Sequence, residues 1–209
     1  MKPAKFDYLR AESVRQAIAA LDQEEGAAIV LAGGQTLVPM LSMRQARPDL
    51  VVDINQISDL SGITLEKNEL LIGACTRQAE VLTSPLVKRH AGLLAKAIAF
   101  VGHQQTRNRG TVGGSLSHAD PASEIPLAAL ALNAYVSLRS VSGIRKVALT
   151  EYFLGPMMTV RKDNELLVSL HIPLSTEIRG TGFHEVSERK GDFAVVAAAA
   201  VIGIDKTGI

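Results

Sequence analysis

The sequence is poor in cysteine and aromatic residues and has no excess of either charge. Its one cysteine, Cys75, allows no intrachain disulfide and cannot supply the thiolates of a structural zinc site or an iron–sulfur cluster. Lys and Arg number 22 against 21 Asp and Glu, so the chain lacks the basic excess of a nucleic-acid-binding protein. The longest apolar run, Ala194 to Ile204, is too short to cross a bilayer. We therefore expect neither a nucleic-acid partner nor a membrane span.

The 209 residues are rich in Ala, Val, Leu and Ile, and 47% of them are hydrophobic. Such a chain can bury a sizeable core and forms one or two domains. The segment from Met1 to Asp7 has no apolar core like that of a secretory signal, which predicts a cytoplasmic protein. The histidines form no cluster that would predict a metal site, and Cys75 is expected to be a small core residue.

The first third of the chain alternates strand and helix signals. Ser13 can cap a helix that runs to about Glu24, with apolar residues spaced along one face. Strands are predicted at 28–31 and 50–54, with a short helix over 37–43 between them. The order strand, glycine turn, helix, strand indicates a small parallel β/α unit.

The rest of the chain mixes helix and strand signals. Helices are predicted over 79–82 (capped by Thr76), 85–100 and 125–132, and strands over 70–74, 134–139, 145–149 and 165–172. Boundaries near Asn55 and Leu174 divide the chain into units 1–55, 56–174 and 175–209. The last unit contains two strand-like elements, 182–188 and 192–204, and two such elements rarely bury a face alone.

Adjacent glycines occur where the strand at 28–31 meets its helix, in the segment Ala32-Gly33-Gly34-Gln35-Thr36. Glycine permits positive φ angles and close approach of a ligand, and the free N–H groups of such a turn can bind an anion. The segment has neither the Gly-Lys-Ser/Thr ending of a Walker A loop nor a GxGxxG motif. On these residues alone, a plain tight turn and a phosphate cradle are equally favoured.

A second glycine pair, Gly113-Gly114, lies in the polar stretch from Gly102 to Glu124, beside several hydroxyl groups. Two donor-rich turns about eighty residues apart could hold the two ends of a cofactor that carries a diphosphate. The alternative is a pair of unrelated structural turns. Glu124 could accept hydrogen bonds from ribose or ribityl hydroxyls, or could favour the start of the following helix.

Taken together, the two glycine segments resemble those of a known protein family. Segment 32–36 and segment 111–124 resemble the flavoprotein (medium) subunit of molybdenum hydroxylases, the xanthine dehydrogenase family that includes bacterial carbon monoxide dehydrogenase. The opening Phe6-Asp7-Tyr8 and the late segment 188–194 resemble the same family, so the likeness covers essentially the whole chain. The resemblance implies an α+β fold. In that fold, a two-part FAD-binding domain, with a small parallel β/α unit and a larger mixed or antiparallel β unit with helices, would precede the start of a C-terminal α+β domain.

The resemblance also implies a set of FAD-binding residues. The first loop would wrap the pyrophosphate, Glu124 would meet the cofactor's hydroxyls, and Phe193 would lie against the flavin ring, where relatives often have Tyr. His184 stands where xanthine dehydrogenase-like members carry Lys near the flavin. No catalytic acid–base residue and no metal ligand is implied. The full set is Ala32, Gly33, Gly34, Gln35, Thr36, Thr111, Gly114, Ser115, Ser117, Glu124, Leu166, Leu167, His184 and Phe193. For Leu166 and Leu167, contact with the adenine and simple core packing are equally favoured.

The implied function is electron transfer within a complex. A large molybdopterin subunit would oxidise the substrate, a small subunit with two [2Fe–2S] clusters would relay electrons to FAD here, and an external acceptor (a quinone, NAD or oxygen) would take them. The assembly would be a heterotrimer or a dimer of heterotrimers. Because the family's C-terminal domain is longer, we expect a C-terminally truncated chain. The alternatives are a stand-alone FAD-dependent oxidoreductase of a related flavin-binding fold and a truncated, non-catalytic assembly subunit.

Overall fold

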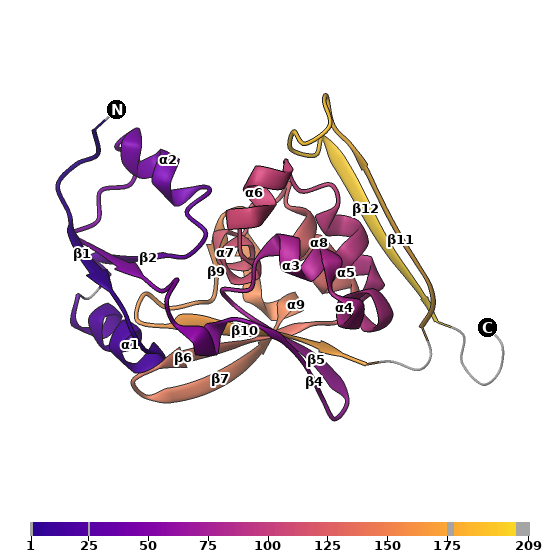
Figure 1. Ribbon diagram of the computed structural model, residues 1–209, viewed down its shortest axis with the longest axis horizontal. Coiled ribbons are helices and arrows are strands. Elements are labelled where there is room, and N and C mark those ends of the chain that lie inside the picture. The colour runs from indigo at the N-terminus through magenta and orange to yellow at the C-terminus, as the bar shows by residue number, and fades with distance from the viewer. Residues whose placement is uncertain (1, 25, 175–177, 204–209) are drawn as a thin grey trace.

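The computed structural model describes residues 2–24, 26–174 and 178–203. Its N-terminal part is a small parallel sheet with the strand order β1-β3-β2 (Figure 1). The elements of this unit are β1 (Asp7–Arg10), α1 (Val14–Gln23), β2 (Ala28–Leu31), α2 (Leu37–Ser42) and β3 (Leu50–Asp53). The predicted parallel β/α unit is confirmed, although no local signal predicts β1.

Helix α1 forms as its sequence predicts. The hydroxyl of Ser13 accepts a hydrogen bond from the N–H of Gln16 at 3.2 Å, which caps the helix. The buried face of α1 packs in a cluster with Val52 of β3 and with Leu166 from the second sheet. This shared cluster joins the N-terminal unit to the rest of the molecule.

The second sheet is antiparallel, with the order β4-β5-β10-β6-β7. Its strands are β4 (Ile63–Glu66), β5 (Glu69–Gly73), β6 (Tyr135–Ser140), β7 (Gly143–Ala148) and β10 (Leu166–Pro173). A 3-10 turn, η1 (Ser58–Leu60), leads into it, and β8 (Phe153–Gly155) pairs separately with β9 (Met158–Thr159). The strands predicted at 70–74, 134–139, 145–149 and 165–172 are confirmed, whereas β4 was not predicted.

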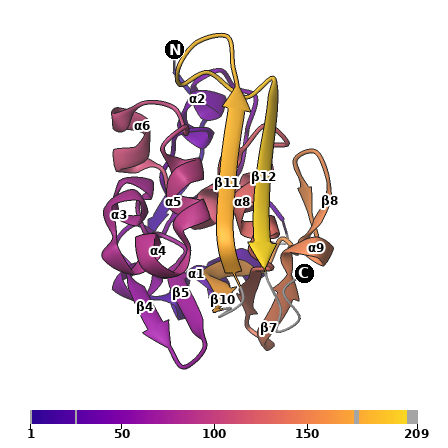
Figure 2. The same cartoon turned by 90° about the vertical axis from the view of Figure 1, so that its right-hand side faces the viewer.

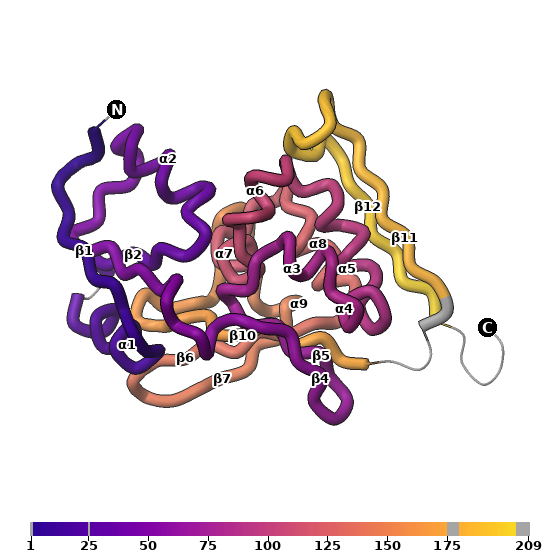
Figure 3. The backbone as a smooth tube through the Cα atoms, viewed as in Figure 1, coloured from indigo at the N-terminus to yellow at the C-terminus, as the bar shows by residue number. Residues whose placement is uncertain are grey.

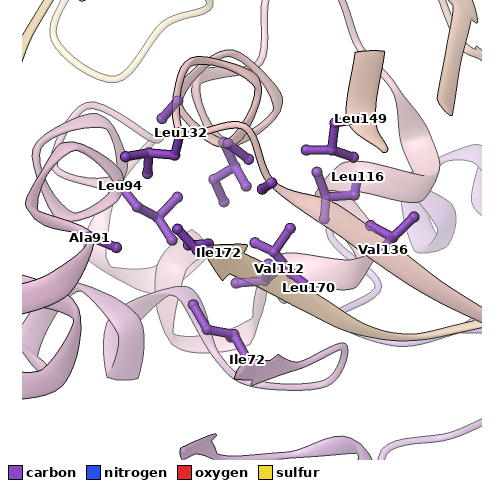
Figure 4. Close-up of a cluster of buried hydrophobic side chains, with 14 of the residues drawn as sticks. Ile72, Ala91, Leu94, Val112, Leu116, Leu132, Val136, Leu149, Leu170 and Ile172 are labelled. Carbon is purple, nitrogen blue, oxygen red and sulfur yellow. The ribbon is translucent and has the colours of Figure 1, made fainter. Parts of the chain in front are cut away.

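Helices cover one face of this sheet (Figure 1). They are α3 (Gln78–Thr83), α4 (Pro85–His90), α5 (Gly92–Ile98), α6 (Gln104–Arg109), α7 (Val112–His118) and α8 (Glu124–Ala131), with the short α9 (Leu149–Tyr152) after β7. The main core lies between the two layers. Figure 4 shows Leu94 and Leu116 from the helices, and Leu132 at the end of α8, in one cluster with Leu170 and Ile172 of β10.

Two predictions in this region are wrong. The single helix over 85–100 is broken at Ala91, whose φ of −140° and ψ of 45° separate α4 from α5. Thr76 does not cap α3, because its hydroxyl donates to the carbonyl of Gly62 at 3.0 Å and accepts from the N–H of Gly62 at the same distance. Arg77 holds the N-cap position instead, without a side-chain bond.

The last described elements form a long antiparallel ribbon, β11 (Ile178–Val186) with β12 (Val196–Gly203). The ribbon lies across α5 and α8, at the end of the molecule opposite the N-terminal unit (Figures 2 and 3). Its inner face contributes Phe183 and Val201 to the core, and its outer face exposes Val196 and Ile202. Within the described segments, no helix has the length and apolarity needed to cross a membrane.

Candidate functional site

A cavity of about 550 Å³ opens between the N-terminal sheet, helices α6 to α8 and the loop that joins β11 to β12. This volume falls in the range of ordinary small-molecule sites, roughly 300–1,000 Å³. We call this cavity the cleft. It is lined by the predicted site residues other than His184, namely Ala32, Gly33, Gly34, Gln35, Thr36, Thr111, Gly114, Ser115, Ser117, Glu124, Leu166, Leu167 and Phe193.

The first glycine loop presents unpaired backbone donors to the cleft. Between β2 and α2, the amide N–H groups of Gly33, Gly34, Gln35 and Thr36 have no hydrogen-bond acceptor among the described residues. Gly34 has a φ of +70°, a left-handed conformation that favours glycine. The side-chain amide of Gln35 donates to the carbonyl of Gly33 at 3.2 Å. Consecutive free amides of this kind form a concave anion-binding surface.

The second glycine segment is helical, which corrects its interpretation as a turn. Gly113 and Gly114 lie in the first turn of α7, and the hydroxyl of Thr111 caps that helix by accepting from the N–H of Gly114 at 3.2 Å. A Cβ on Gly113 would lie 2.5 Å from the Cβ of Ala74, so glycine is needed for close packing on the end of β5. The hydroxyls of Ser115 and Ser117 line the cleft from the same helix.

Thr111→Val should destabilise the chain by about 1 kcal/mol, because it removes the acceptor that caps α7 while keeping the shape of the side chain. For a chain of this size, we expect a decrease in Tm of about 2–4 °C in a thermal unfolding experiment. Thr111→Ser retains the hydroxyl and should unfold close to the wild-type temperature. Equal losses in both variants would contradict the capping role.

The two glycine segments are in direct contact. A Cβ on Gly33 would lie 2.5 Å from the carbonyl oxygen of Arg109 and 2.9 Å from the Cα of Gly110, so the chain from α6 to α7 packs on the backbone of the first loop. The guanidinium of Arg77 donates to the carbonyl of Arg109 and, at 2.7 Å, to the side-chain oxygen of Asn55. Asn55 in turn donates to the carbonyl of Ala32 at 2.8 Å.

We call Arg77 and Asn55 the loop clamp, because together they bond to the first glycine loop and to the connection between α6 and α7. These two segments are the two walls of the cleft. Neither residue was predicted. Asn55 lies two residues after the carboxyl end of parallel strand β3, a region where polar residues often gather at ligand sites, and this position could have indicated it. Arg77 had no such signal.

Asp53 fixes the orientation of the clamp. Its carboxylate accepts from the backbone N–H of Asn55 at 2.9 Å and from the phenol of Tyr8 at 2.5 Å. Burial raises the pKa of Asp53, but the hydrogen bonds from Tyr8 and Asn55 outweigh that effect and hold the pKa below its ordinary value. The charged carboxylate is therefore the stable form that holds Asn55 in place.

The acids of the cleft differ in their surroundings. Glu124 is the first residue of α8 and is 6% exposed, and burial raises its pKa to about 7. Glu165, just before β10, forms an ion pair with Arg145 at 2.6 Å, and this hydrogen-bonded partner lowers the pKa of Glu165. Leu166 and Leu167 are buried in the core and also line the cleft, so the structure is compatible with both roles predicted for them.

The β11–β12 loop places one predicted residue at the cleft and leaves another away from it. Phe193 is 72% exposed and lines the cleft. Gly191, with a φ of +92°, packs so closely on His103 that a Cβ would lie 2.6 Å from its ring. His184 lies on the exposed face of β11, because Phe183 and Glu185 on either side of it face inward. The structure therefore does not bring His184 to the cleft.

The remaining candidates have structural roles. Cys75 is buried in the core, as predicted, and burial raises the pKa of its thiol to about 11. His171 is buried between Ser137 and Ser169 and bonds to Glu69 at 3.0 Å. No group of three or more His, Cys, Asp or Glu side chains that could hold a metal ion occurs in the described residues.

Free backbone amides at a cleft that is also lined by the first turn of a capped helix are typical of a site for a phosphate-bearing cofactor. Comparison with known proteins defines the family. Residues 4–175 match the FAD binding domain in molybdopterin dehydrogenase, and the chain belongs to this family. It is the FAD-binding medium subunit of an oxidoreductase of the molybdenum hydroxylase type, as the resemblance implied.

Individual relatives support the same family assignment. The 6-hydroxypseudooxynicotine dehydrogenase complex subunit alpha of Paenarthrobacter nicotinovorans is 41% identical over 208 residues, which cover 100% of this chain and 70% of the relative. The carbon monoxide dehydrogenase medium chain of Hydrogenophaga pseudoflava is 36% identical over 202 residues, covering 97% of this chain and 70% of the relative.

Solved structures of the same class confirm the predicted α+β fold. Carbon monoxide dehydrogenase from Hydrogenophaga pseudoflava superimposes with a TM-score of 0.93 at 36% identity, covering 96% of this chain and 70% of that one. Quinoline 2-oxidoreductase from Pseudomonas putida 86 also gives a TM-score of 0.93 at 36% identity, covering 98% of this chain and 71% of that one.

Proposed function

We propose that the chain binds FAD in the cleft and passes electrons through it, from [2Fe–2S] clusters of a small partner subunit to an external acceptor. In this proposal a large molybdopterin-binding subunit completes the complex, as a heterotrimer or a dimer of heterotrimers. The observation that carries the proposal is the row of unpaired amides in segment 32–36, which faces a cleft of cofactor size.

The residues present fit FAD. The free amides of the first loop are suited to the pyrophosphate, and the side chains of Gln35 and Thr36 add donors. Hydroxyls on and before α7 (Thr111, Ser115, Ser117), together with Gly114 and Glu124, are suited to the polar middle of the cofactor. Leu166 and Leu167 offer an apolar wall for the adenine, and exposed Phe193 offers a ring surface for the flavin.

Bound FAD supplies the redox chemistry, and this chain supplies binding and orientation. The first loop and α7 hold the cofactor from two sides, and the loop clamp fixes their separation. No residue of this chain is assigned as a general acid or base. A role for His184 near the flavin remains a prediction, and its exposed position does not favour it in the conformation described.

The proposed partners are consistent with the names of the relatives, several of which are medium chains or subunits of complexes. The sequence has one cysteine, which is buried, so iron–sulfur clusters ligated by thiolates would belong to another chain. We also propose the division into 1–55, 56–174 and 175–209, since β1 to β3 lie in the first unit, β4 to β10 in the second, and the ribbon in the third.

The test is the visible absorbance spectrum of the purified chain, with the released cofactor identified after denaturation. We expect a flavin spectrum and release of FAD. Release of FMN would overturn the assignment in favour of another flavin fold. A colourless protein that takes up no added FAD would overturn it in favour of the non-catalytic assembly role.

A second experiment tests whether the chain assembles with the proposed partner subunits. Affinity purification of the tagged chain from its native host should recover a large molybdenum-containing chain and a small cysteine-rich chain. Full dehydrogenase activity with the chain alone would instead support the stand-alone oxidoreductase.

A further inference from the structure

Among the described residues that line the cleft, Arg161 is the only lysine or arginine. It lies between β9 and β10, is half-buried, and was not predicted from the sequence. Four acids line the same cavity, namely Asp120, Glu124, Glu165 and Asp192. Because a cofactor with a diphosphate brings further negative charge to this site, a cation in its wall favours binding.

Hydrogen bonds to the backbone hold the guanidinium of Arg161 in place. Its Nη1 donates to the carbonyl of Lys162 at 2.9 Å and to the carbonyl of Glu165 at 2.8 Å. The N–H of Glu165 donates to the carbonyl of Lys162 at 3.0 Å, so both acceptors belong to one closed turn. The planar guanidinium is therefore fixed at the start of β10, where Leu166 and Leu167 directly follow Glu165.

The same turn is supported from a second side, and this support leaves Arg161 without an acidic partner. The carboxylate of Glu165 accepts two hydrogen bonds from Arg145, at 2.6 and 2.8 Å. Arg145 also donates to the carbonyl of Val160 at 2.8 Å. In the described part of the chain, Arg161 itself forms no ion pair.

Part of the guanidinium also has no hydrogen-bond partner. The acceptors described for the side chain of Arg161 are the two carbonyl groups that its Nη1 contacts. For its Nε and Nη2, the described residues provide no acceptor. A fixed cation that lines a cleft with unused donors is available to a ligand.

The surroundings of Arg161 suit a flat aromatic ring. Leu166 and Leu167 line the cleft next to the turn and provide an apolar surface. A guanidinium is planar and weakly hydrated, so it stacks on aromatic faces, and the bases of nucleotides stack on arginine in this way. The free amides of segment 32–36 are suited to the diphosphate and Phe193 to the flavin, which leaves the adenine for this end of the cleft.

We propose that the guanidinium of Arg161 packs against the adenine ring of FAD and makes the chain selective for FAD over FMN, which has no adenine. The inference rests on the proposed function, because it takes FAD as the ligand and Leu166 and Leu167 as the wall for its adenine. Arg161 contributes to binding and specificity and takes no part in electron transfer.

The experiment is a titration of the flavin-free chain with FAD, with FMN and with ADP, which carries adenine and a diphosphate but no flavin. Flavin fluorescence reports the first two ligands, and competition with FAD reports the third. Arg161→Met keeps the length of the side chain but removes the planar cation. We expect the Kd values for FAD and ADP to rise about tenfold in this variant, while the Kd for FMN stays at the wild-type value.

Arg161→Lys separates the planar contact from the charge and from support of the turn. A lysine ammonium keeps the positive charge and can donate to the same carbonyl groups, but it has no flat surface. In the flavin-free chain, we expect Arg161→Met to lower Tm and Arg161→Lys to unfold close to the wild-type temperature. The Kd of Arg161→Lys for FAD should nevertheless stay at least about fivefold above that of the wild type.

Lys162→Gln is the matched control for loss of charge. Lys162 is the next residue in the chain and is exposed, and its side chain does not line the cleft. The substitution removes one positive charge close to the same site, and a solvent-exposed charge is well screened. We expect wild-type Kd values for FAD, FMN and ADP in this variant.

Each outcome has a distinct meaning. If Arg161→Met binds FAD as the wild type does, or if its affinity for FMN falls by the same factor as that for FAD, the contact with adenine is disproved and FAD binding stands. If Arg161→Lys restores the affinity for FAD, charge or support of the turn explains the loss, and the planar contact is disproved. If the wild-type chain itself binds no FAD, the proposed function fails.

Discussion

Gly33→Val should yield a folded chain that retains no FAD. The new Cβ would lie 2.5 Å from the carbonyl oxygen of Arg109 and 2.9 Å from the Cα of Gly110, closer than real Cβ atoms approach a backbone. Neither neighbour is a flexible side chain, so the first loop and the α6–α7 connection must move apart. The free amides of segment 32–36 then no longer face α7 at the spacing that the cofactor needs.

The measurement is the ratio of flavin to protein absorbance after purification with added FAD. Gly155→Val is the matched control, because a Cβ there meets no atom within 4 Å, and it should retain the wild-type ratio. The clash lies outside both core clusters, so far-ultraviolet circular dichroism should be preserved. Wild-type flavin content in Gly33→Val would show that contact between the two walls does not shape the site.

The first glycine loop was predictable from sequence because its signals are local. A capped helix, a short apolar strand and a glycine pair follow one another within the first third of the chain, and each element depends on near neighbours. The resemblance to a family added the cofactor. The structure adds that Gly34 is required for its positive φ and that Gly33 is required for its contact with a segment far along the chain.

The second glycine pair was misinterpreted because its cause is tertiary. Glycine has low helix propensity, so Gly113-Gly114 favours a turn on local grounds. The structure instead places both in α7, where Gly113 packs on Ala74 and the cap of Thr111 compensates the weak propensity. The local sequence pattern could not reveal this, because the contact comes from Ala74, which directly follows β5 and is distant from Gly113 in the sequence.

The sequence alone also could not predict which face of β11 carries His184. Strand β11 was predicted in part, but residues alternate between the faces of a strand, and packing decides which face is buried. Phe183 contacts Phe100, with ring centroids 5.3 Å apart, and this contact turns His184 outward. Matching His184 to a single position in the family does not determine which face of the strand it occupies.

The loop clamp gives the other large expected effect. Arg77→Met keeps the aliphatic bulk of the side chain but leaves the carbonyl of Arg109 and the side-chain oxygen of Asn55 without their charged donor. Two hydrogen bonds to a charged group are lost, so the free energy of unfolding should fall by about 3 kcal/mol. We expect Tm to decrease by about 6–12 °C and the affinity for FAD to fall about 100-fold, because the two walls lose their fixed spacing.

A double-mutant cycle distinguishes a clamp from two independent contacts. Asn55→Ala alone should weaken FAD binding in the same way, since it breaks the bond to Ala32 as well as the bond to Arg77. If both residues act through one connection, Arg77→Met in the Asn55→Ala background should cost far less than in the wild type. Arg89→Met, at an exposed arginine on α4, controls for loss of charge and should leave Tm and affinity unchanged. Additive losses would show that Arg77 and Asn55 act separately and do not form a single clamp.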